Sequence, residues 1–371
     1  MSNAGIYLDW NATTPPHPAV LAAMTRAAEE CWGNPSSTHR VGRQARARVE
    51  DAREKLAEIC AVHARDVLFT SGGTEANNLA LAGAVGLALT RLEHPSVTRV
   101  AEQLEQRGVP VVWVEVPATG RVAAEAYQEA LTRLPRGSLA VLMAANHETG
   151  VLQPLEQVAL MAHELGATLH VDAVQALGKL APETWRFADS LALAAHKIRG
   201  PKGLGALAFR GSKAPKPVLL GGSQERGLRP GTVDPIAAAG FLAALEQAAQ
   251  GPARYAELRL LRDDFESAFT SVAELNGGQV ARLPHVSNLS FVGVSGDEIV
   301  AALDLMGVCV SSGSACSAGT TEPSSVITAM LGRERARAAV RVSLGEGTTN
   351  GEIQAAKAAF RRVLQLTAAN P

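Results

Sequence analysis

The chain has 371 residues, of which 47% are apolar and 19% charged, and its 35 basic and 36 acidic residues leave a net charge of −1. This composition is typical of a soluble globular protein of more than one domain. A near-neutral chain gives no electrostatic reason to expect nucleic acid or an anionic membrane surface as a partner. No segment resembles an export signal or a membrane span, so we expect a cytoplasmic protein with reduced cysteines.

Six short apolar runs, separated by helical patterns, are predicted to be strands. They cover residues 67–70, 109–116, 139–145, 167–173, 191–196 and 206–210. Most are continuously apolar, which is typical of strands covered on both faces. The apolar run Leu79–Leu89 is predicted to be a buried helix segment. This alternation predicts an α/β fold with a parallel sheet, in which ligands bind at the carboxyl ends of the strands.

The pattern changes after about residue 245. A charged helix is predicted over Glu257–Phe269, followed by a strand over Asn288–Val294 and a loop rich in Ser and Gly. A last helix carries Ile353, Ala356, Phe360 and Val363 on one stripe. These elements predict a second, smaller α+β domain.

Three motifs follow predicted strands in the first part of the chain. In Thr70–Asn77 a strand runs into Gly72, Gly73 and Thr74 before a helix, and such a helix start can bind phosphate. A strand ends in Asp172, and another ends in His196 and Lys197, where a desolvated amine can form a Schiff base. Each motif alone also suits an ordinary turn, a helix cap or a solvated lysine. Together they match pyridoxal phosphate, which needs an anion site, a carboxylate and an amine.

Cys316 lies in a loop of small residues without apolar neighbours, unlike a structural cysteine. An accessible thiol of this kind is typical of a nucleophile or a sulfur carrier. No spacing of His and Glu residues fits zinc, and no dinucleotide fingerprint is present. We therefore expect no stable metal site, although Cys316 could serve as a transient iron–sulfur ligand.

With these residues assembled, the sequence resembles the NifS/IscS-type cysteine desulfurases, which are pyridoxal-phosphate enzymes of the class V aminotransferase group. The resemblance extends from Tyr7 to about Leu366, in segments that follow the order of the family. These segments are 11–15, 33–37, 70–77, 93–95, 146–150, 172–175, 196–197, 225–232, 311–316 and 341–345. It implies fold type I, with a large cofactor-binding domain over 14–245 built on a mainly parallel seven-stranded sheet. Residues 1–13 and 246–371 would form the small domain that carries the Cys316 loop.

The resemblance implies a role for each matching position. Lys197 would bond the cofactor's aldehyde, Asp172 would pair with its ring nitrogen, and Gln175 would bind its ring hydroxyl. His94 would stack on the ring and move protons, including the proton of the Cys316 thiol. The residues implied to bind phosphate are Gly73, Thr74 and His196, together with Thr232 for the partner subunit's cofactor in a homodimer. The residues implied to bind the substrate carboxylate are Arg341, Asn11 and Asn34.

Two positions depart from the family pattern. His147 stands where an asparagine is usual near the ring hydroxyl, and a neutral imidazole keeps one hydrogen-bond donor there. Ala194 stands where many members have a serine that contacts the phosphate. The lost hydroxyl predicts weaker binding of the cofactor by about 1 kcal/mol.

The implied activity is the conversion of L-cysteine to L-alanine, with transfer of the sulfur to Cys316 as a persulfide. The sulfur would then pass to an acceptor protein, such as an iron–sulfur scaffold. Three alternatives remain open at this point: a selenocysteine lyase, a class V aminotransferase, and a sulfur-relay or scaffold-binding partner without catalysis.

Overall fold

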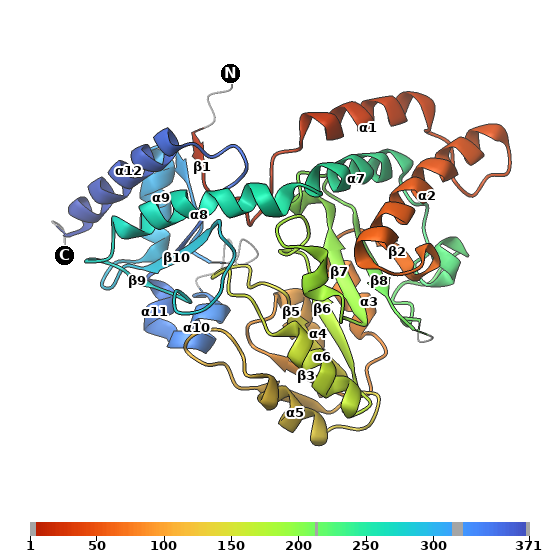
Figure 1. The fold of residues 1–371 in the computed structure, drawn as a ribbon, viewed down its shortest axis with the longest axis horizontal. Helices are drawn as coiled ribbons and strands as arrows, with labels where there is room; N and C mark the ends of the chain where they lie inside the picture. Colours follow the sequence, from red (N-terminus) through yellow and green to blue (C-terminus); the bar gives the residue numbers. More distant parts are fainter. Residues whose placement is uncertain (1–4, 212–213, 314–321, 369–371) are drawn as a thin grey trace.

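The computed structural model of the chain describes residues 5–211, 214–313 and 322–368 (Figure 1). Its largest sheet has seven strands in the order β2-β8-β7-β6-β5-β3-β4. Strand β8 runs opposite to the other six strands, so the mainly parallel seven-stranded sheet expected from the sequence is confirmed. The strands are β2 (Val67–Thr70), β3 (Leu87–Thr90), β4 (Val111–Val114), β5 (Leu139–Met143), β6 (Thr168–Asp172), β7 (Ser190–Ala194) and β8 (Gly205–Phe209).

All six predicted strands belong to this sheet, and the seventh, β3, lies where the prediction was wrong. The run Leu79–Leu89 is not one helix segment, because helix α3 (Gly73–Leu81) ends inside it and β3 begins at Leu87. A turn at Ala82–Gly86 separates the two. Residues such as Leu79 and Leu89 are equally apolar and fully buried in either element, so their composition does not distinguish helix from strand.

Helices cover the sheet on both faces. On one face pack α2 (Arg40–Cys60), α5 (Ala124–Thr132), α6 (Leu155–Glu164) and α7 (Pro235–Ala248), and α1 (Pro18–Glu30) lies against α7. The other face is covered by α3 and α4 (Pro95–Gln106). Alternate strand residues face opposite clusters, as Leu191 and Ala192 do in β7. The continuously apolar strands of the sequence are therefore buried on both sides.

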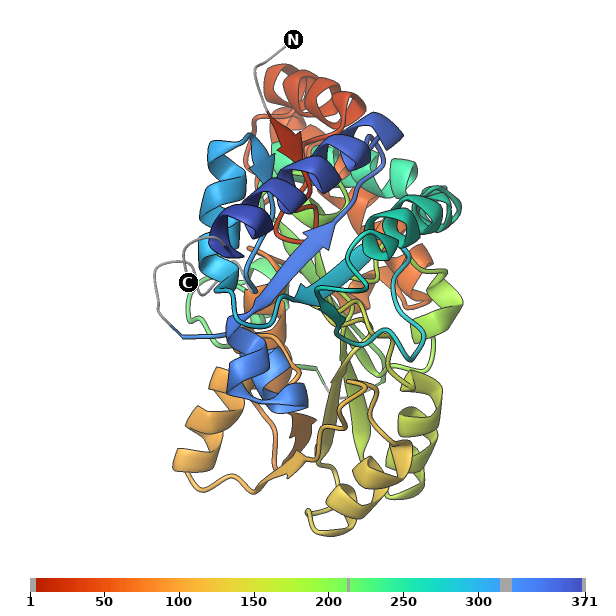
Figure 2. The ribbon, with the colours of Figure 1, turned by 90° about the vertical axis from the view of Figure 1, so that its left-hand side faces the viewer.

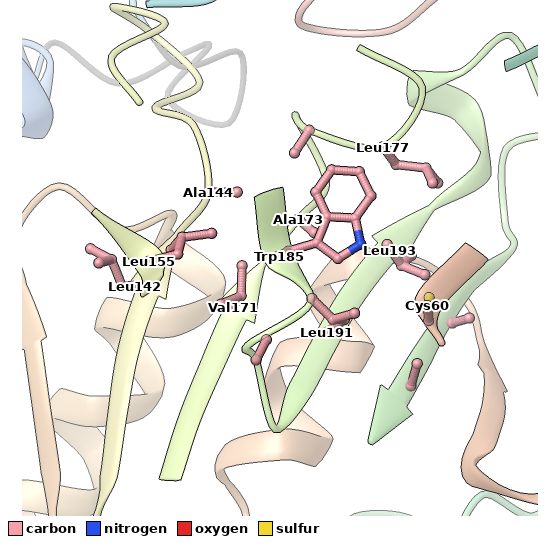
Figure 3. Packing of buried hydrophobic residues seen from close by; sticks show 14 of the residues in the cluster. Cys60, Leu142, Ala144, Leu155, Val171, Ala173, Leu177, Trp185, Leu191 and Leu193 are labelled. Carbon is pink, nitrogen blue, oxygen red and sulfur yellow. The ribbon is translucent and has the colours of Figure 1, made fainter. Parts of the chain in front are cut away.

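An aromatic residue from outside the strands packs into the hydrophobic core on one face of the large sheet. A short 3-10 helix, η2 (Pro182–Trp185), carries Trp185, whose side chain is 1% exposed. Figure 3 shows its indole close to Ala173, Leu191 and Leu193, which lie directly after β6 and on the neighbouring strand β7. Burying so large a ring contributes several kcal/mol to the stability of this layer.

A second hydrophobic cluster joins the two ends of the chain. It contains Leu8 near the N-terminus together with residues between 255 and 363. Strand β1 (Ile6–Tyr7) pairs with β11 (Val308–Cys309), and both views place β1 beside the C-terminal helix α12 (Asn350–Ala368) (Figures 1 and 2). The separation of the two clusters is consistent with two domains, and the expected boundaries at residues 13 and 245 stay a prediction.

The second cluster is built on a three-stranded antiparallel sheet. Its strands are β9 (Glu274–Leu275), β10 (Val286–Ser290) and β12 (Ala339–Ser343). Around it lie α8 (Gly251–Ser267), α9 (Gly296–Leu305), α10 (Ser325–Leu331), α11 (Arg333–Arg337) and α12. The helices expected near 257–269 and at the C-terminal end are confirmed. The strand expected over 288–294 lies earlier, because the chain turns after Phe291 through Gly293, whose φ is +84°.

Candidate active site

Five strand ends of the large sheet open into one pocket. Strands β3, β5, β6 and β7 are parallel, and β2 points the same way because both β2 and β7 run antiparallel to β8. Their carboxyl ends therefore lie at the same edge of the sheet, as expected for a ligand site in an α/β fold. The pocket has a volume of about 200 Å³. Its lining includes Asn11, Gly73, Thr74, His94, His147, Asp172, Gln175, Ala194, His196, Lys197 and Arg341.

The end of β7 supplies the pocket's amine. A 3-10 turn, η3 (Ala195–Lys197), follows Ala194 and brings His196 and Lys197 to the site. Lys197 Nζ donates to the backbone oxygens of Asn11 and Ala12, the latter at 2.7 Å. His196 Nδ1 lies 3.0 Å from Thr13 Oγ1, and burial beside Lys197 lowers the pKa of His196 to about 4. The histidine is therefore neutral at physiological pH.

The carboxylate of Asp172, at the end of β6, is 7% exposed and held by two donors. Val174 N donates to its Oδ1 at 3.0 Å, and Asn77 Nδ2 donates to its Oδ2 at 2.8 Å. The Oδ1 of Asn77 lies 3.0 Å from His170 Nε2, and burial lowers the pKa of His170 to about 3. A buried carboxylate with this support can face a cationic ring nitrogen.

Two histidine rings meet in the pocket. His94 caps α4, with Nδ1 accepting from Ser96 N at 3.1 Å. The ring of His147 lies edge-on to it, with centroids 5.5 Å apart. Burial and neighbouring cations lower the pKa of both, most strongly that of His147. Both rings are thus held neutral in the pocket.

Asn11 connects the pocket to the second cluster. It is 1% exposed, and its amide is engaged on both sides. Its Nδ2 donates to the backbone oxygen of His147 at 3.1 Å, and its Oδ1 lies 2.9 Å from His285 Nε2. Its own backbone oxygen accepts from Gln175 Nε2 at 3.0 Å and from Lys197 Nζ. These contacts position the strand ends of the large sheet relative to the N-terminal segment.

Arg341 reaches the pocket from β12 of the smaller sheet and is 2% exposed. Its Nη2 donates to Asp9 Oδ1 at 2.6 Å and its Nη1 to the backbone oxygen of His147 at 3.1 Å. Its Nε is buried and has no hydrogen-bond partner among the residues that the structure describes, and the same is true of His147 Nδ1. Buried nitrogens without partners are costly unless a ligand satisfies them.

These features fit pyridoxal phosphate. Helix α3 begins at Gly73 without a side chain capping its first turn, which leaves backbone N–H groups for an anion. A Cβ added at Gly73 would lie 2.6 Å from Val174 Cγ2, so glycine is required for the close approach of the two segments. The amine of Lys197 and the carboxylate of Asp172 line the same pocket. Within the described ranges, no cluster of three metal-ligating side chains is found.

Two residues expected at the site, Asn34 and Thr232, do not line the pocket, and a third, Cys316, is not among the residues that the structure describes. Asn34 is exposed and does not line the pocket, and its Oδ1 accepts from Ser36 N at 2.9 Å. Thr232 is exposed and also does not line the pocket. Cys316 belongs to residues 314–321, which lie outside the described part of the chain. The roles expected for these three residues stay predictions.

Several residues that support the pocket were not expected from the sequence. Asn77, Ser96 and His170 form a hydrogen-bonded cluster behind Asp172. Lys179 is 2% exposed and donates to Gln175 Oε1 at 2.8 Å, while burial and the charges of Lys197 and Arg341 lower the pKa of Lys179. The available signal was a polar residue within a few positions of a motif residue, as His170 lies two residues before Asp172 on the same strand.

Comparison with known proteins agrees with this geometry. Residues 6–356 match the Aminotransferase class-V family. The chain is 41% identical over 363 residues to a cysteine desulfurase of Cereibacter sphaeroides, covering 94% of this chain and 92% of the relative. It is 37% identical over 369 residues to an IscS-like cysteine desulfurase of Mycobacterium tuberculosis, covering 94% of each.

Solved structures extend the match to three dimensions. A NifS-like protein superposes with a TM-score of 0.89 at 30% identity, covering 98% of this chain and all of that one. The protein SspA, solved in complex with cysteine, gives a TM-score of 0.80 at 30% identity and covers 93% of this chain. The expected α/β architecture of fold type I is thereby confirmed. The chain belongs to the class V aminotransferase family and, within it, to the NifS/IscS-type cysteine desulfurases.

Proposed function

We propose that the chain binds pyridoxal phosphate in this pocket and converts L-cysteine to L-alanine, leaving the sulfur on Cys316. The observation that carries the proposal is the convergence of Lys197, Asp172 and the start of α3 in one pocket beside Arg341. Cysteine bound to the structural neighbour SspA supports the choice of substrate. When bound, the cofactor would supply an electron sink for the Cα carbanion.

Residues that follow different strands would bind different parts of the cofactor. Gly73, Thr74 and His196 would hold the phosphate, and Asp172 would keep the ring nitrogen protonated. Lys197 would bond the aldehyde and, once displaced by the substrate amine, act as base for the Cα proton. Gln175 and His147 would bind the ring hydroxyl, and Ala194 would leave the phosphate one donor short.

Arg341 would bind the carboxylate of the substrate. Its guanidinium is held by Asp9, and its Nε is the buried donor without a partner among the described residues. A planar guanidinium oriented in this way recognises a carboxylate better than a flexible ammonium. Asn11, which fixes the neighbouring backbone, would assist from the N-terminal segment, and Asn34 would do so only if its loop moves toward the pocket.

The sulfur step is a transfer between two thiol groups. The C–S bond of L-cysteine breaks, and an S–S bond forms between its sulfur and Cys316 Sγ. A proton replaces sulfur at Cβ to give L-alanine, so Cys316 ends as a persulfide with no external oxidant or reductant. A protein acceptor, such as an iron–sulfur scaffold, would then take the terminal sulfur.

The enzyme would act as a homodimer. Thr232 is exposed outside its own pocket, consistent with a contact to the phosphate of the partner's cofactor. On the same connection Leu220 is 92% exposed, an apolar side chain that an interface would cover. In the part of the chain that the structure describes, no helix has the length and apolarity to cross a membrane. The cytoplasmic location stays a prediction.

The test is the product balance with L-cysteine. Wild-type protein loaded with pyridoxal phosphate should form alanine and, without a reductant, a mass increase of one sulfur on the peptide containing Cys316. The variant Cys316→Ser should keep the cofactor's absorption and lose the persulfide. Undiminished sulfur transfer in this variant would contradict the assignment, and alanine formation independent of Cys316 would favour an aminotransferase or a lyase.

A further inference from the structure

A continuous hydrogen-bonded chain connects the carboxylate of Asp172 to the ring of His94. Asn77 Nδ2 donates both to Asp172 Oδ2 and to Ser96 Oγ, each at 2.8 Å. Ser96 Oγ in turn lies 2.8 Å from His94 Nδ1. Asn77 is 1% and Ser96 7% exposed, so solvent competes little with these bonds. This series of hydrogen bonds starts at Asp172, which is expected to pair with the ring nitrogen of the cofactor. It ends at His94, which is expected to stack on the face of that ring.

The direction of every hydrogen bond in this chain is determined. An ionised Asp172 only accepts, so Asn77 must turn its NH₂ group toward the carboxylate and its Oδ1 toward His170. The second N–H of Asn77 reaches Ser96 Oγ, which leaves the single hydroxyl proton of Ser96 for His94 Nδ1.

A second donor specifies the same state of His94 independently. The backbone N–H of Ser96, in the first turn of α4, points to His94 Nδ1 at 3.1 Å. A backbone N–H can only donate, so Nδ1 must carry a lone pair and no proton. In a neutral imidazole the proton is then on Nε2.

We propose that Ser96 and the Asp172–Asn77 pair hold His94 as the Nε2–H tautomer, so that its second nitrogen serves the reaction as a hydrogen-bond donor. A nitrogen that already carries a proton has no lone pair to take another. In this proposal His94 is not the base that deprotonates Cys316, contrary to the expectation from the sequence. Another group, such as Lys197, would accept the proton of the thiol. Asn77 and Ser96 are positioning residues. The tautomer does not depend on the proposed function, whereas its catalytic consequence rests on it.

The tautomer can be measured without turnover. Nitrogen-15 NMR of the full-length protein with labelled histidine, with and without pyridoxal phosphate, should show a protonated Nε2 and an unprotonated Nδ1 for His94. The variant His94→Gln identifies its signals by their loss. His63 is the control, because it is exposed, precedes a short 3-10 helix and makes no capping bond, so its two tautomers should average. A protonated Nδ1 at His94, or averaging like that of His63, would overturn the proposal.

The catalytic consequence has its own measurement. Gln at position 94 keeps an N–H donor without a basic nitrogen, whereas Ala keeps neither. We expect His94→Gln to retain at least tenfold more cysteine desulfurase activity than His94→Ala. Equal losses in the two variants would contradict the donor role. Absence of alanine formation by the wild type would instead remove the proposed function, while the NMR result would still decide the tautomer.

Discussion

At the scale of single residues, Ala194 is one of the two pocket positions, with His147, that are expected to depart from the family pattern. This residue ends β7, is 1% exposed and lines the pocket close to the first turn of α3. Replacement by serine adds a hydroxyl donor where the phosphate is expected. We predict that Ala194→Ser binds pyridoxal phosphate about fivefold more tightly, equivalent to about 1 kcal/mol.

Titration of apoprotein with pyridoxal phosphate, followed by absorbance or by quenching of tryptophan fluorescence, measures this affinity. The wild type is the reference for this affinity. A serine at the neighbouring Ala195 would not be a suitable control, because Ala195 is fully buried in the core. Unchanged or weaker binding by Ala194→Ser would show that no phosphate oxygen lies within reach of position 194.

His170 predicts a specific dependence of stability on pH. Its pKa is lowered to about 3 in the folded protein because the ring is fully buried, whereas it is near 6.5 in the unfolded chain. Between these values the unfolded state binds one more proton than the folded state, so acidification favours unfolding. The contribution is absent above pH 6.5 and grows below it by about 1.4 kcal/mol per pH unit.

The variant His170→Gln keeps a donor for Asn77 Oδ1 and removes the titrating ring. As the pH is lowered from 6.5 to 4.5, the denaturant midpoint should therefore fall less steeply for this variant than for the wild type. The difference in slope should correspond to the uptake of one proton on unfolding. An identical slope for His170→Gln and the wild type would refute the prediction.

At the scale of elements, a buried ion pair holds the loop that leads to Thr232. Arg53 of α2 donates to both carboxylate oxygens of Glu225, at 2.8 and 2.6 Å, and Glu225 also accepts from Phe69 N at 2.9 Å. Glu225 and Arg226 have φ values of +45° and +59°, which cost energy for side chains with a Cβ. The ion pair therefore ties a strained loop to the edge of the sheet.

We predict that Arg53→Leu lowers the free energy of unfolding by about 3–5 kcal/mol, because it leaves the buried Glu225 carboxylate without its cationic partner. Chemical denaturation measures this loss. The double variant R53L/E225Q should be more stable than R53L, since a neutral amide needs no cation. Lys55→Leu, which removes an exposed pair with Glu58, should cost below about 1 kcal/mol. A similar cost for Arg53→Leu and Lys55→Leu would contradict the prediction.

Six of the seven strands of the large sheet could be predicted because each is a short apolar run, and Gly72, Asp172 and Lys197 lie just after three of these strands or at their ends. Strand β3 was missed because the run Leu79–Leu89 resembles one continuous segment, although Gly83 and Gly86 lie in the turn that divides it. The series of hydrogen bonds that connects Asp172 to His94 could not be predicted from the sequence either. Asn77 and Asp172 are 95 residues apart, and only tertiary packing brings them to 2.8 Å.

At the scale of the whole molecule, the pocket lies where two hydrophobic cores meet. The large sheet contributes the residues expected to bind the cofactor, and the smaller sheet contributes Arg341. Asn11 lies between them and bonds to both sides through His147 and His285. In the proposed function, the residues that bind the substrate carboxylate and those that bind the cofactor would thus come from different layers of the fold.

We expect Lys197 to be the lysine that bonds pyridoxal phosphate in this pocket, and a second lysine nearby makes a stringent test possible. Lys179 is also buried and is bonded to Gln175 of the same pocket. Reduction of the loaded protein with borohydride, followed by peptide mapping, locates the pyridoxyl group. We predict that it is found on Lys197 and is absent from Lys197→Ala. A pyridoxyl group on Lys179 or on a surface lysine of the wild type would contradict the account.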